Sequence, residues 1–280
     1  MNEVTDVTRT ARPPVAGERA DPGGLRDASP ARRHTAYLLS LGDDALVYAQ
    51  RLGEWLTHAP QIEEDMALGN VGLDLLGQAR SLLTRAGEVE GEGRDEDALA
   101  MLRDERDFRN VQLVEQPRGD FAHEMARMLW FATYQHELYS RLVDSADETL
   151  AGIAQKAVKE VDYHRDHATQ WVLRLGDGTE ESHQRMQAAL EAVHPYVREL
   201  GEDYPAAVWA AEQGIGVLPS GLADTVTGAV EQVVARATLT VPDPPRWHAR
   251  GGRDGVHSEA MGFLLAEMQH IARSHPGATW

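Results

Sequence analysis

Apolar residues recur every three or four positions from Thr35 onwards, a spacing that is typical of helices with one buried face. The stripe from Leu38 to Leu56 predicts one long helix, which ends at residues 58–60 (HAP). A second helix is predicted over about 61–86. Its apolar face would consist of Ile62, Met66, Gly69, Leu73, Leu76 and Leu83. The short turn between these helices predicts that they lie side by side.

The second half of the chain keeps this periodicity. Further helices are predicted over about 120–143, 147–175, 181–200, 218–238 and 256–273. Residues 87–119 lack a sustained period and predict an irregular connection with one short helix near 95–103. Strict alternation of apolar and polar residues never lasts five positions, which argues against strands. Long paired helices with one long crossover predict an all-α, ferritin-like helical bundle with extra C-terminal helices.

Residues 1–33 differ from the rest of the chain, because they are rich in proline and glycine and have no apolar period. Such a segment buries too little apolar surface to offset its conformational entropy. We therefore predict a disordered N-terminal tail over residues 1–33 and one ferritin-like helical domain over residues 34–280.

Composition excludes several classes of protein. The 280 residues contain no cysteine, so disulfides, Cys-ligated metals and thiol nucleophiles are ruled out. The formal net charge of −18 argues against a nucleic-acid partner. No apolar run is long enough to span a membrane, and residues 1–30 lack the apolar stretch of a signal peptide, so we expect a cytoplasmic protein without a membrane partner.

Four ionisable residues lie between apolar neighbours within the predicted helices. They are Glu54, Asp74, Glu160 and His164. A bundle that binds two irons takes a lone Glu from each of two helices and Glu-x-x-His from each of the other two. One hypothesis is therefore a ferritin-like di-metal oxidase or oxygenase that is catalytic in its own right.

The spacing of the histidines argues against that hypothesis. The second predicted helix contains no histidine, and Glu160 precedes His164 by four residues rather than three. We interpret the four residues as remnants of a degenerate metal site that now form a structural polar core, with no catalytic residue and no metal in this chain. In that interpretation Glu160 and His164 pair with each other, Asp74 pairs with a core arginine such as Arg80, and Glu54 is a charge on a helix surface.

The predicted crossover contains a mixed polar segment, residues 103–110 (RDERDFRN). Arginines beside an aromatic ring and exposed backbone suit the phosphates and adenine of a nucleotide-like ligand. The alternative is a connector held by salt bridges.

The chain resembles the C subunit of phenylacetyl-CoA epoxidase. The resemblance is carried by residues 41–46 (LGDDAL), 51–55 (RLGEW), 67–80 (ALGNVGLDLLGQAR), 103–106 (RDER), 113–117 (LVEQP), 264–269 (LLAEMQ) and 275–280 (HPGATW). It covers residues 35–280 and leaves the predicted tail outside.

The resemblance implies a structural, non-catalytic subunit that supports the di-iron catalytic A subunit in aerobic phenylacetate degradation. It further implies that a reductase subunit with a flavin and an iron–sulfur cluster supplies electrons from NADPH, and that this chain binds no cofactor itself. By the same resemblance, Asp107, Phe108, Arg109 and Asn110 are candidate contacts to the CoA ester. A third hypothesis is a stand-alone module that binds acyl-CoA.

Four aromatic residues of the third long helix are candidate anchors for the catalytic subunit. They are Trp130, Phe131, Tyr134 and Tyr139. The alternative is that this stripe belongs to the internal core.

Overall fold

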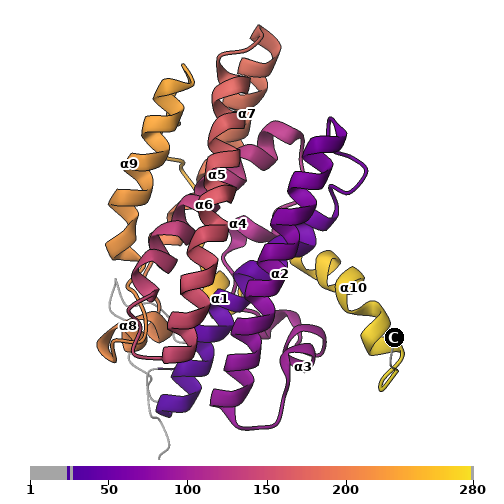
Figure 1. Ribbon diagram of the computed structural model, residues 1–280, viewed down its shortest axis with the longest axis vertical. Coiled ribbons are helices and arrows are strands. Elements are labelled where there is room, and N and C mark those ends of the chain that lie inside the picture. Colours follow the sequence, from indigo (N-terminus) through magenta and orange to yellow (C-terminus); the bar gives the residue numbers. More distant parts are fainter. Residues whose placement is uncertain (1–23, 26–27, 279–280) are drawn as a thin grey trace, which may run out of the picture.

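A computed structural model describes residues 24–25 and 28–278, and within these residues it contains helices and no strand (Figure 1). The α-helices are α1 (Pro30–Gly53), α2 (Ile62–Glu90), α3 (Glu96–Met101), α4 (Gln112–Glu115), α5 (Phe121–Leu142), α6 (Glu148–Gly176), α7 (Glu180–Val197), α8 (Pro205–Glu212), α9 (Ser220–Arg236) and α10 (Glu259–Ser274). The predicted all-α, ferritin-like bundle is confirmed. No helix in the described residues is long and apolar enough to cross a membrane.

Four long helices make the bundle. Helix α1 packs along α2, α5 packs along α6, and α2 meets α6 to join the two pairs. The predicted crossover between α2 and α5 contains α3, α4 and a 3₁₀ turn at Glu105–Asp107. Helices α7 and α9 extend the bundle beside α5, whereas α10 lies against α3 and α4 (Figure 1). The C-terminal elements therefore cover two different parts of the bundle.

The first helix begins earlier than predicted. Ser29 is its N-cap and accepts a hydrogen bond from the backbone N–H of Arg32 at 3.3 Å, and Pro30 occupies the first helical position, where it is well tolerated. Residues 30–33, which we predicted as tail, therefore belong to α1. Residues 1–23 and 26–27 of that predicted tail lie outside the described residues. The helix also ends earlier, at Gly53, and a turn precedes α2.

Helices α5 and α6 begin within one residue of their predicted starts because the sequence contains their caps. Asp120 accepts a hydrogen bond from the backbone N–H of His123 at 2.9 Å. Asp147 likewise accepts from the backbone N–H groups of Thr149 and Leu150. Helix α8 was not predicted, because its eight residues are too few to establish a period.

The predicted apolar face of α2 is wrong for most of its members. Ile62, Met66, Leu73 and Leu76 are exposed at 72%, 65%, 66% and 47%, and only Leu83 is buried. The buried face consists instead of Leu68, Val71, Leu75, Ala79 and Leu82. Helix α2 therefore has two apolar faces, of which the described residues cover one.

The aromatic stripe of α5 belongs to the core. Trp130, Phe131, Tyr134 and Tyr139 are all at most 4% exposed, and the Phe131 ring packs edge-on against Tyr48 of α1 at 5.1 Å. These residues are therefore not anchors for another subunit.

Helix α6 ends where its backbone meets the end of α9. A Cβ atom placed on Gly176 would lie 2.4 Å from the carbonyl oxygen of Ala237, so this position requires glycine. By contrast, a Cβ on Gly228, within α9, has no neighbour within 4 Å among the described residues.

We expect Gly176→Ala to lower the free energy of unfolding by about 1–3 kcal/mol through overpacking. Gly228→Ala is the matched control, and we expect it to leave stability unchanged or to raise it by up to about 1 kcal/mol, since alanine favours helix. Urea denaturation of both variants measures this difference. Equal effects would contradict the close approach of α6 and α9.

Candidate functional site

The crossover is fixed to α1 by one buried carboxylate. Asp43 forms a two-point ion pair with Arg103, and its Oδ2 also accepts the backbone N–H of Arg109 at 2.8 Å. The Arg103 guanidinium lies over the Phe108 ring, 4.3 Å from its centroid. Asp43 therefore holds both ends of the segment from Arg103 to Arg109.

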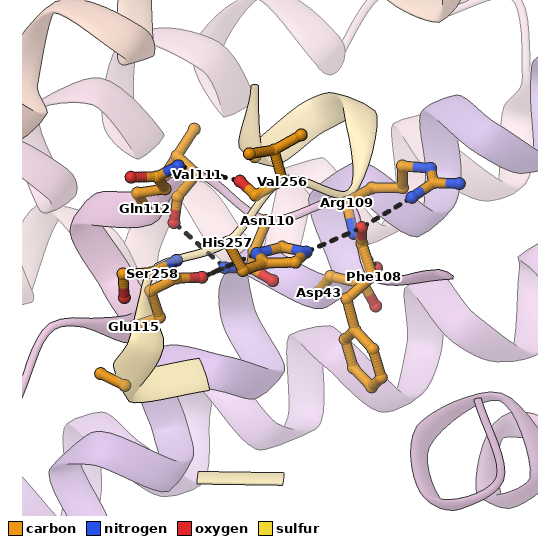
Figure 2. Close-up of polar contacts among 12 residues, drawn as sticks. Asp43, Phe108, Arg109, Asn110, Val111, Gln112, Glu115, Val256, His257 and Ser258 are labelled. Atoms are coloured by element: carbon orange, nitrogen blue, oxygen red, sulfur yellow. Dashed lines mark hydrogen bonds and ion pairs between the residues drawn. The ribbon is translucent and has the colours of Figure 1, made fainter. Parts of the chain in front are cut away.

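A second cluster joins the crossover to the segment before α10 (Figure 2). Glu115 lies 2.8 Å from Nδ1 of His257, and it accepts hydrogen bonds from the Asn110 side chain at 2.9 Å and from the backbone N–H of Ser258 at 2.5 Å. Nε2 of His257 lies 3.2 Å from the carbonyl oxygen of Phe108. Both ring nitrogens therefore face acceptors, an arrangement that suits the doubly protonated, charged imidazolium.

The four candidate CoA contacts divide into two groups. The side chains of Phe108 and Asn110 are fully buried and point into the protein, where Asn110 bonds Glu115 and the carbonyl of Val111 (Figure 2). Asp107 is exposed, and its carboxylate accepts the backbone N–H of Asp104 at 3.3 Å. Arg109 is half-buried, and its guanidinium donates to the carbonyls of Arg106 and Phe108. Of the four, only Asp107 and Arg109 reach the surface in this conformation.

A third buried ion pair lies beside Asp43. Asp44 pairs with Arg253 through both guanidinium nitrogens, at 2.9 and 2.7 Å, and Arg253 also donates to the carbonyl of Arg109 at 2.8 Å. Burial raises the pKa of Asp44, although the guanidinium of Arg253 opposes that rise. Removing one partner of such a pair typically costs about 3–5 kcal/mol.

Glu199, before α8, completes this region. Its carboxylate accepts the backbone N–H groups of Gln112 at 2.7 Å and of Gly252 at 2.8 Å. Burial raises the pKa of Glu199 to about 7. Residue 252 must be glycine, since a Cβ there would lie 2.3 Å from the carbonyl oxygen of Asn110.

The predicted polar core is split between different partners. Asp74 of α2 lies 3.1 Å from Nε2 of His164 of α6, so its predicted pairing with Arg80 is wrong. Arg80 instead pairs with Glu96. Glu160 does not pair with His164 but accepts a hydrogen bond from the Gln78 side chain at 3.0 Å, because positions four apart on α6 meet successive turns of α2.

Glu54 lies at a different place. It follows the last residue of α1 and pairs with Arg51 at 2.5 Å, with its side chain 28% exposed. Its backbone carbonyl accepts a hydrogen bond from Arg118. Glu54 therefore joins α1 to the start of α5, whereas Asp74, Glu160 and His164 lie between α2 and α6.

None of the buried carboxylates that hold the crossover was predicted, and a further one on α5 was also missed. Glu124 of α5 is fully buried, forms an ion pair with Arg127, and accepts hydrogen bonds from the Tyr48 hydroxyl at 2.7 Å and from Nε1 of Trp55 at 2.8 Å. The sequence does contain a signal for this ion pair. It is a Glu-x-x-Arg spacing, with an arginine at the position where an iron-binding bundle would have histidine.

The His, Asp and Glu side chains of the bundle interior do not fit a site for two irons. In the described part of the chain, no three His, Asp or Glu side chains gather closely enough to hold a metal ion. The carboxylate of Glu124 is already paired with Arg127 and accepts hydrogen bonds from Tyr48 and Trp55. Asp74 and Glu160 are bonded to His164 and Gln78 respectively.

Comparison with known proteins assigns the family. Residues 25–280 match the model of the family described as phenylacetic acid catabolic protein. The chain belongs to this family. It is 46% identical over 246 residues to the C subunit of 1,2-phenylacetyl-CoA epoxidase from Escherichia coli (strain K12), a match that covers 88% of this chain and 98% of that relative. The helical bundle is the ferritin-like fold of this family.

In this family member, the cluster around Glu115 makes stability depend on pH. Burial lowers the pKa of His257, but the hydrogen bond to Glu115 and its charge outweigh burial, and the pKa is raised above 6.5. A histidine whose pKa is raised on folding contributes stability that is complete below the unfolded-state pKa. That contribution is lost as pH rises through the higher folded-state pKa.

We expect His257→Gln to lower the free energy of unfolding at pH 6 by about 1.5–3 kcal/mol, the usual value of a hydrogen bond to a charged group. The deficit should shrink at higher pH, once the histidine of the parent protein is neutral. Urea denaturation at pH 6 and pH 9 measures this, with His58→Gln, at an exposed position, as control. A deficit that is the same at both pH values would rule out a charged His257.

Proposed function

We propose that this chain is a non-catalytic structural subunit of a multicomponent phenylacetyl-CoA epoxidase. It supports the separate catalytic A subunit, which holds the di-iron centre and is called the di-iron subunit below, in aerobic phenylacetate degradation in the cytoplasm. The relative that is 46% identical is named as the C subunit of such an epoxidase, which supports membership of a hetero-oligomer.

The state of Glu124 is the observation that carries the proposal. A bundle carboxylate that binds iron must keep a lone pair for the metal, whereas both oxygens of Glu124 are already bonded to Tyr48, Trp55 and Arg127. The Arg127 guanidinium is a fixed positive charge that opposes an adjacent metal cation. Both oxygens of this interior carboxylate thus accept hydrogen bonds from protein donors, which favours a structural role.

In this proposal the cofactors belong to other subunits. Iron is held by the di-iron subunit, and the reductase subunit with its flavin and iron–sulfur cluster takes electrons from NADPH. A contact with the CoA ester rests on Asp107 and Arg109, since these residues reach the surface. The di-metal oxidase remains the alternative.

We expect the chain, produced alone with ample iron and purified without chelators, to contain close to zero iron per chain. Metal analysis by mass spectrometry measures this directly. A load of about two irons per chain would favour the di-metal oxidase instead. An oxo-bridged absorption band would identify such a centre.

We expect the double variant Glu160→Gln, His164→Gln to keep epoxidation within about twofold of the parent when the di-iron subunit and the reductase are present. Glutamine at each position can still hydrogen-bond to Gln78 or Asp74, so the packing of α2 on α6 is preserved. Turnover of phenylacetyl-CoA by the reconstituted complex is the measurement.

Asp44→Asn is the comparison variant, because it disrupts the buried pair with Arg253 and should lower turnover through loss of the folded chain. If the double variant assembles normally but turnover collapses, the non-catalytic role is wrong.

A further inference from the structure

Helix α2 carries an apolar stripe that the described part of the chain leaves exposed, with the spacing of a helix-pairing surface. Its members are Ile62, Met66, Gly69, Leu73 and Leu76, which we call the α2 seam. The intervals are four, three, four and three residues, as at the a and d positions of successive heptads. The four side chains of the seam are 47–72% exposed, and large exposed patches on soluble proteins mark interaction sites.

The seam borders a groove between α1 and α2. The groove encloses about 630 Å³, and residues from the end of α1, including Gly53, and exposed Leu56 just beyond it form its other side. Met101 and Met268 lie at its margin. Methionine is common at surfaces that bind apolar partners, because its side chain adapts to their shape. The groove is thus mostly apolar, although Gln50, Asp65 and Asn70 also line it.

Among the described residues, little packs against two glycines of α2, Gly69 within the seam and Gly77 at a hollow shared with α6. Gly72 faces α1, since a Cβ there would lie 3.8 Å from the carbonyl oxygen of Ala49. A Cβ on Gly69 would contact only the tip of Leu56, at 3.5 Å, and among the described residues one on Gly77 would contact nothing within 4 Å. Glycine weakens a helix, and a small residue lets two helix backbones approach closely, so Gly69 in the middle of the seam suits contact with another helix.

The charges beside the seam indicate what kind of chain approaches. Glu63 is exposed, and Asp65 and Asp74 flank the seam on either side of Gly69. Burial lowers the pKa of His164, so at neutral pH this histidine is uncharged and leaves the charge of Asp74 in place. A second copy would bring an equally acidic seam and a further net charge of −18. Like charges in apposition disfavour such self-pairing.

We propose that the α2 seam receives a helix of the di-iron subunit, with apolar residues at heptad spacing and Lys or Arg at its flanks. The inference rests on the proposed function, because it takes the di-iron subunit as the partner. Two helices that both carry apolar residues at heptad spacing pack side by side at a shallow angle, and the side chains of each fill the grooves of the other.

The experiment measures association of the full-length chain with the di-iron subunit of the same epoxidase by light scattering and titration calorimetry. We expect Leu73→Glu and Met66→Glu each to weaken association by roughly 30- to 100-fold, as for a central residue of an interface. Because both side chains are exposed, the thermal midpoint of the isolated chain should not change. Val208→Glu, at an exposed apolar position of α8, is the matched control and should bind like the parent.

Two further measurements test the chemistry of the partner. Gly69→Leu, which adds no charge, should also weaken association because it blocks close approach. Added salt should weaken binding of the parent protein, because it screens the acidic margin from basic flanks. Salt-independent binding would contradict the basic flanks.

The possible failures are distinct. If the parent chain does not associate with the di-iron subunit at all, the proposed function fails. If it associates and the seam variants bind equally well, the seam is not the interface. If the isolated parent chain is a dimer that Leu73→Glu converts to a monomer, the occupant is a second copy and the inference is overturned.

Discussion

Two adjacent buried carboxylates on α1 determine how the rest of the chain is arranged. Asp43 holds Arg103 of the crossover, and Asp44 holds Arg253 of the segment before α10. Consecutive residues of a helix point in directions about 100° apart, so one helical turn faces two distant segments at once. Neither carboxylate can stay charged in the interior without its arginine, because burying an unpaired charge is very costly. The fold therefore requires the crossover and the C-terminal segment to lie against α1.

This constraint explains how the crossover is held against the bundle although it contains little regular structure. Backbone groups at residues 108, 109 and 111 are bonded to Asp43, Asp44, Arg253 and His257 rather than to a helix or sheet partner. A segment held in this way presents a defined surface, on which Asp107 is exposed and Arg109 is half-buried. The polar residues that suggested a ligand site thus serve largely to attach the connection to the bundle.

The sequence allowed the helices to be predicted well because their signals are local. Apolar spacing and caps such as Asp120 and Asp147 act within one or two turns. The pairing of residues that are far apart in the sequence was not predictable from such local signals. Arg253 is 209 residues from Asp44, and nothing in its neighbourhood identifies that partner. The choice between the two apolar faces of α2 likewise depends on what packs against each face, which periodicity alone does not contain.

The pairing of Asp44 with Arg253 also sets an order of events during synthesis. The ribosome releases α1 and α2 long before residue 253, so the first helices emerge with Asp44 lacking its counter-ion. The buried pair with Asp44 cannot form until residue 253 has emerged. Truncation before residue 253 would therefore affect the first helix of the bundle, at the opposite end of the sequence from the cut.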